Sequence, residues 1–126
     1  MRLGVSERVR FLGFLDNPYP LLASSDVFVH TARWEGFGLV IAEAMALGIP
    51  VIATSCAGGP SEILGNGRYG ILAPPEDPES IAEALIRAAS DEALLADLSE
   101  RGVRRVAEYE PEVVAATAID LLKELR

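Results

Sequence analysis

The chain has 126 residues, half of them hydrophobic, a size that suits one compact domain and leaves no room for a second. Its formal net charge of −8 disfavours binding to nucleic acid and to an anionic membrane surface, because both would be repelled. The apolar stretches are too short to span a bilayer, there is no secretory signal, and Cys56 is the only cysteine, so we expect a cytoplasmic protein without disulfides or membrane insertion.

Apolar runs alternate with helical patterns along the chain, which is typical of a parallel sheet flanked by helices. The sequence predicts four short strands, over Val9–Leu12, Val27–His30, Val51–Thr54 and Gly70–Leu72. Helices are expected between these strands, over Asn17–Ser25, Gly38–Leu47 and Pro60–Leu64. We therefore predict an α/β fold with a Rossmann-like parallel sheet.

The last third of the chain is predicted to be helical. Asp77 is a good N-cap, and Pro78 suits the first helical position. A helix from Asp91 to Tyr109 carries two i,i+4 pairs on a solvated face, Asp97/Arg101 and Glu100/Arg104. Pro111 begins a further helix with an apolar stripe, formed by Val114, Thr117, Ala118, Leu121, Leu122 and Leu125.

The most informative segment is the glycine-rich turn from Glu35 to Glu43, which follows a predicted strand and opens a predicted helix. Such a turn lies at the carboxyl edge of the sheet, where open α/β proteins bind ligands. Gly36 and Gly38 leave backbone N–H groups uncovered, and the helix N-terminus adds partial positive charge, which together favour a diphosphate. Glu35 and Glu43 flank this anion site, and carboxylates accept hydrogen bonds from sugar hydroxyls. The combination predicts a nucleotide-sugar site.

Two other interpretations of this turn are open. It is also a broken dinucleotide-binding fingerprint, which lacks the third glycine and an acidic ribose partner. Alternatively, the glycines only shape a tight turn and Glu43 is a solvated helix residue. His30 ends a strand beside the site, where a lone histidine is more often packed and hydrogen-bonded than a ligand contact. We interpret Cys56 as a small filler rather than a nucleophile.

The segment from Glu35 to Glu43 matches the E-x7-E motif of retaining family 4 glycosyltransferases, which have the GT-B fold. Its setting resembles the same family over residues 9–89, in blocks that come in family order: Val9–Leu15 (VRFLGFL), Asp26–Val29 (DVFV), Glu43–Thr54 (EAMALGIPVIAT), Gly58–Ile63 (GGPSEI) and Gly70–Pro74 (GILAP). The resemblance implies a single partial domain over residues 1–126, the C-terminal donor-binding domain of such an enzyme without its first two strands.

The resemblance also implies a role for each site residue. Glu35, the residue assigned to the catalytic site, would hold hydroxyls of the transferred sugar, and Glu43 would bind the ribose hydroxyls. Backbone contacts to the base, the sugar and the diphosphate would come from Phe14, Leu15, Gly36, Phe37, Gly38 and Leu39. The family takes a nucleoside diphosphate sugar as donor and uses no metal or other cofactor.

The sequence departs from the family in three respects. Thr31-Ala32 stands where Pro-Ser is frequent, and neither the Arg/Lys pair that grips the diphosphate nor the acceptor-binding domain has a counterpart. Three hypotheses therefore stay open: a donor-binding part of a glycosyltransferase, a non-catalytic nucleotide-sugar-binding or protein-interaction module, and an inactive gene remnant. We expect the isolated chain to be inactive. We also expect it to form a homodimer, or to pair with a partner chain that supplies the missing strands.

Overall fold

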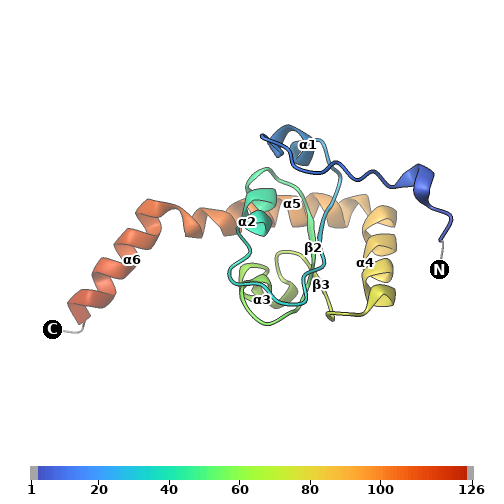
Figure 1. The fold of residues 1–126 in the computed structure, drawn as a ribbon. Helices are drawn as coiled ribbons and strands as arrows, with labels where there is room; N and C mark the ends of the chain where they lie inside the picture. Colours follow the sequence, from blue (N-terminus) through green and yellow to red (C-terminus); the bar gives the residue numbers. More distant parts are fainter. Residues whose placement is uncertain (1–2, 125–126) are drawn as a thin grey trace.

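A computed structural model describes residues 3–124 of the chain (Figure 1). Three short parallel strands form one sheet in the order β1-β2-β3, with Val29 beside Ile52 and Ala53 beside Leu72. The strands are β1 (Phe28–His30), β2 (Val51–Thr54) and β3 (Ile71–Ala73). The parallel sheet with its flanking helices confirms the predicted fold class, and three of the four predicted strands form.

Alternate residues of β2 point into two separate hydrophobic cores. Val51 and Ala53 belong to a core that also takes in α2 (Leu39–Ala46) and α3 (Gly59–Ile63). Ile52 belongs to a second core with two alanines of α4 (Pro78–Ser90). Because strand side chains alternate between faces, the two cores lie on opposite faces of the sheet. The continuous apolar run of β2 is therefore explained by helices that cover both faces.

The helix α4 begins after its predicted cap, and α5 begins one residue after the start predicted at Asp91. The Asp77 carboxylate accepts a hydrogen bond of 3.0 Å from the Ser80 N–H at the start of α4. Asp91 accepts a 2.9 Å hydrogen bond from the Leu94 N–H and caps α5 (Glu92–Val106), which is followed by a 3-10 turn, η3 (Ala107–Tyr109). The two predicted i,i+4 ion pairs, Asp97–Arg101 and Glu100–Arg104, are both present on α5.

The strand predicted over Val9–Leu12 is wrong. This part of the chain follows a short 3-10 turn, η1 (Ser6–Arg8), and forms neither helix nor strand. Phe11 is 97% exposed and Phe14 is 90% exposed, and Gly13 has a φ of +66°, which interrupts an extended path. A strand forms only where its backbone groups find a partner, and this segment has no neighbour in the described sheet. The helix predicted next does form, as α1 (Tyr19–Ala23).

The last helix, α6 (Pro111–Glu124), begins at Pro111 as predicted and projects away from the rest of the fold (Figure 1). Its apolar stripe is exposed, with Val114 at 51% and Leu122 at 64%, and Leu125 lies outside the described residues. Within residues 3–124, no helix combines the length and the apolar character needed to cross a membrane.

Candidate functional site

Two loops meet backbone to backbone at the carboxyl edge of the sheet. The loop after β1 leads into α2, and the loop after β2 leads into α3. Trp34 and Ala57 form a parallel bridge between the loops, and the Glu35 N–H donates to the Ala57 carbonyl at 3.3 Å. The Gly59 N–H donates to the Gly36 carbonyl at 2.7 Å. The glycine-rich turn is thus held against the start of α3.

Gly58 and Gly59 make this close approach possible. A Cβ atom on Gly58 would collide with the Glu35 carbonyl, and one on Gly59 would collide with the Phe37 carbonyl and lie 2.6 Å from the Phe37 Cα. Glycine is the residue used where two backbones come this close. The roles predicted for the site did not include this pair, although two adjacent glycines before a proline were a visible signal.

Gly38 turns the chain into α2. It is buried, it adopts a φ of +89°, and it stands immediately before Leu39, the first helical residue. No side chain caps this helix N-terminus. The first N–H groups of a helix have no partner within it, so an uncapped and partly exposed first turn offers its donors and the positive end of the helix dipole to an anion.

The Glu35 carboxylate is held in one orientation. Its Oε2 lies 3.2 Å from the Nε2 of His30, at the end of β1, and its Oε1 accepts a 2.9 Å hydrogen bond from the Gly36 N–H. The side chains of His30 and Glu35 are 14% and 32% exposed. His30 is therefore packed against Glu35, as its position favoured, but its buried Nδ1 has no hydrogen-bond partner among the described residues. Its partner was not predicted, because nothing in the sequence pairs two residues across an irregular loop.

Glu43 lies in the second turn of α2 and is tied to α1. Its Oε1 accepts a hydrogen bond of 3.1 Å from the hydroxyl of Tyr19. This hydrogen bond, together with the negative charge of Glu43, raises the pKa of Tyr19, because both favour the protonated phenol. The contact spans 24 residues along the chain, and no sequence pattern indicated it.

The other predicted site residues lie in two different places. Phe37 and Leu39 continue the turn and, with Glu43, line an apolar groove of about 800 Å³ between α2, α5 and the start of α6. Phe14 and Leu15 lie in the irregular segment before α1, and in the described part of the chain no hydrogen bond joins them to the turn. Their contact with a base stays a prediction.

Two other kinds of candidate site are a reactive cysteine and a metal centre. Cys56 is a free thiol that is 4% exposed, as its interpretation as a small filler requires. Among residues 3–124, no three His, Cys, Asp or Glu side chains gather in a group able to hold a metal ion.

Known proteins match both this sequence and this fold. The family model described as "Glycosyl transferases group 1" matches residues 2–105. The lipopolysaccharide core biosynthesis glycosyltransferase LpsE of Rhizobium meliloti is 37% identical over 121 residues, which cover 95% of this chain and 35% of LpsE. HepE from Anabaena in complex with UDP has a TM-score of 0.81 at 31% identity, over 96% of this chain and 34% of HepE. HepE is also solved with UDP-glucose.

A third relative is the C-terminal domain of LpcC, a glycosyl transferase group 1 family protein from Francisella tularensis. It has a TM-score of 0.72 at 32% identity, over 82% of this chain and 54% of that domain. The chain spans about a third of the length of LpsE and of HepE. Because the family model covers most of the sequence and the relatives share its fold, the chain belongs to the group 1 glycosyltransferases, with the Rossmann-like fold of a GT-B C-terminal domain.

Proposed function

We propose that this chain is the donor-binding part of a retaining glycosyltransferase and holds a nucleoside diphosphate sugar at the glycine turn. The observation that carries the proposal is the uncapped N-terminus of α2, with Glu35 fixed at the start of the turn and Glu43 on the helix that the turn opens. The complexes of HepE with UDP and UDP-glucose support a nucleotide sugar as the ligand class.

The diphosphate would lie against the turn from Gly36 to Leu39. The backbone N–H groups at the start of α2 have no capping side chain, and Gly36 leaves open space around its Cα. When the bond between the anomeric carbon and the diphosphate breaks, negative charge develops on the departing phosphate oxygens. Donors that already point at these oxygens stabilise that charge without reorganising. In this proposal the chain itself meets the diphosphate charge, without a metal or other cofactor.

The two carboxylates would bind hydroxyls on either side of the diphosphate. Glu35 Oε1 accepts one hydrogen bond from the Gly36 N–H, and Oε2 lies 3.2 Å from His30 Nε2, which leaves lone pairs on both oxygens for a hydroxyl of the transferred sugar. His30 keeps this carboxylate from rotating away. Glu43 shares one oxygen with Tyr19 and has its second oxygen for the ribose hydroxyls.

The base would contact the backbone of Phe14 and Leu15. Support for this placement comes from Tyr19, which begins α1 four residues after Leu15 and donates to Glu43. The segment before α1 is thereby tethered to the helix that would hold the ribose.

Titration calorimetry with UDP, GDP and their sugars tests the proposal. We expect Glu43→Ala to weaken the binding of the nucleotide sugar by about ten- to a hundredfold, because a charge-assisted hydrogen bond is lost. The matched control is Glu92→Ala, which removes an exposed carboxylate from the first turn of α5. Equal affinities in the two variants would refute the assignment of Glu43. A wild-type chain that binds none of these ligands would refute the proposed function itself.

A further inference from the structure

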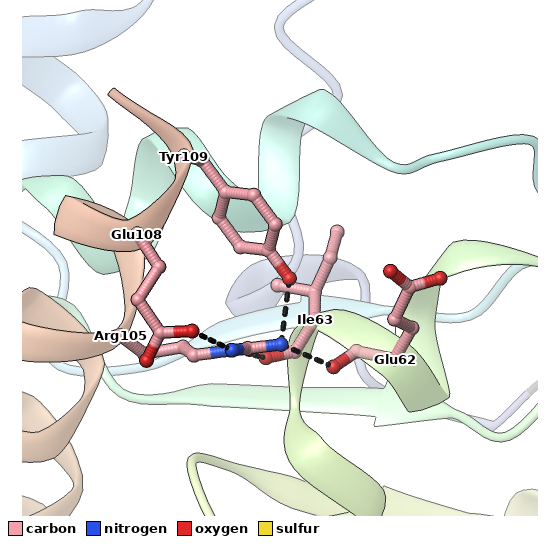
Figure 2. A network of polar contacts seen from close by, with 5 residues as sticks. All are labelled: Glu62, Ile63, Arg105, Glu108 and Tyr109. Carbon is pink, nitrogen blue, oxygen red and sulfur yellow. Dashed lines mark hydrogen bonds and ion pairs between the residues drawn. The ribbon is translucent and has the colours of Figure 1, made fainter. Parts of the chain in front are cut away.

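Arg105 of α5 secures the end of α3 through an extended set of contacts (Figure 2). Its Nε donates to the Ile63 carbonyl at 3.2 Å, and its Nη2 donates to the Glu62 carbonyl at 3.0 Å. These carbonyls belong to the last turn of α3, where helical partners run out. The Arg105 side chain is only 17% exposed, although neighbouring Arg104 is 67% exposed. Arg105 is therefore built into the fold, whereas Arg104 is a surface residue.

The same guanidinium holds Tyr109. Nη2 donates to the Tyr109 hydroxyl at 2.8 Å, and the guanidinium carbon lies 5.0 Å from the centre of the Tyr109 ring and 5.3 Å from that of Tyr69. Glu108 forms an ion pair with Nη1. Figure 2 shows the guanidinium between the Tyr109 hydroxyl and the two α3 carbonyls. A planar group with five donors can serve all of these partners at once, which a lysine cannot.

Tyr109 carries the contact on to the glycine turn. Its ring meets the Phe37 ring edge-on, with the centroids 5.4 Å apart and the planes at 86°. Phe37 lies between Gly36 and Gly38, and its backbone abuts Gly59, the first residue of α3. The contacts therefore connect the turn with both ends of α3. The turn touches the start of α3, the end of α3 is held by Arg105, and Arg105 returns to the turn through Tyr109 and Phe37.

We infer that Arg105 and Tyr109 are positioning residues for the glycine turn, which they hold at a fixed distance and orientation from α3. Arg105 does not line the groove beside the turn, and the role inferred for Tyr109 is to support Phe37. Their effect would be to keep the backbone N–H groups around Phe37 in place before a ligand arrives, which is how preorganisation lowers the cost of binding. The consequence for affinity rests on the proposed function, whereas the effect on the turn does not.

Amide hydrogen exchange of the ligand-free chain, measured by NMR, tests the inference. The reporters are the N–H groups of Gly59 and Glu35, which bond across the two loops. We expect Arg105→Ala and Tyr109→Phe to speed the exchange of both reporters by about tenfold, while the amides of β2 keep their rates. Tyr109→Phe keeps the ring and removes only the hydroxyl, so it is compatible with folding. Arg104→Ala is the matched control and leaves all of these rates unchanged.

Reporters that keep the wild-type rate, or that speed up only in step with the amides of β2, would overturn the inference, because the two residues would then stabilise the fold as a whole. A UDP titration of the same variants separates this result from the proposed function. If the wild-type chain binds UDP, we expect Arg105→Ala and Tyr109→Phe to weaken binding by about three- to tenfold and Arg104→Ala to match wild type. If the wild-type chain does not bind UDP, the proposed function fails, and the exchange rates still decide the inference.

Discussion

Replacing Gly59 by alanine should disrupt the contact between the two site loops through sterics alone. Gly59 does not require a positive φ, so alanine is compatible with its local backbone. The added Cβ would nevertheless lie 2.6 Å from the Phe37 Cα, where ordinary contact begins at 3.4 Å. Because this Cβ would also collide with the Phe37 carbonyl, the loop and α3 must separate by more than about 1 Å, and the hydrogen bond from the Gly59 N–H to the Gly36 carbonyl must lengthen or break.

The expected destabilisation follows from three contributions. Forcing an extra methyl group into a packed contact costs about 1–3 kcal/mol. Loss of the hydrogen bond between the loops costs about 1 kcal/mol more. Alanine in place of glycine at the start of a helix stabilises the folded state by about 1 kcal/mol, because it reduces the conformational freedom of the unfolded chain. We therefore expect the free energy of unfolding to fall by about 1–3 kcal/mol.

Urea denaturation followed by circular dichroism measures this change. The matched control is Gly36→Ala on the other side of the same hydrogen bond. A Cβ atom on Gly36 would have open space around it, and Gly36 does not have a positive φ. The free energy of unfolding of Gly36→Ala should therefore stay close to that of wild type. If Gly59→Ala proves as stable as Gly36→Ala, the close approach of the two loops is not a feature of the folded protein and the reasoning fails.

Three further predictions concern activity, ionisation and assembly. The isolated chain should transfer no labelled sugar, because the resemblance places acceptor-binding groups elsewhere; turnover that Glu35→Ala abolishes would contradict this. Tyr19 should ionise at a higher pH than an ordinary tyrosine, and Glu43→Gln should lower its pKa by removing the carboxylate acceptor, as an ultraviolet difference titration against wild type will reveal. Light scattering should give a mass of at least twice 13.5 kDa, because β1 has an open edge in the described sheet and Phe11 and Phe14 are exposed; a monomer would disprove it.

Local patterns predicted the elements that depend on local physics. The cap at Asp77 binds an N–H group three residues away, and the strand at Val51–Thr54 is apolar on both faces, so the residues of each element indicate it directly. The segment Val9–Leu12 has the composition of a strand but not the partner that a strand requires. Composition alone does not report whether a partner is present, and this is why that prediction failed.

The candidate site was predictable only where its residues are neighbours in the sequence. The glycines and carboxylates of the turn from Glu35 to Glu43 predicted this part of the site. The contacts that hold it join residues far apart, such as Tyr19 with Glu43 and Arg105 with the Ile63 carbonyl 42 residues away. Such pairs depend on how the helices pack, and no short stretch of sequence predicts helix packing.

The bridge between Trp34 and Ala57 has a practical consequence. Trp34 is the only tryptophan in the sequence, it precedes Glu35 directly, and it is 79% exposed at the junction of the two site loops. An indole in water emits at longer wavelength than one that is covered. The tryptophan fluorescence of the native chain therefore comes from a single position at the rim of the candidate site, and it will shift to shorter wavelength whenever a ligand or a partner covers that rim.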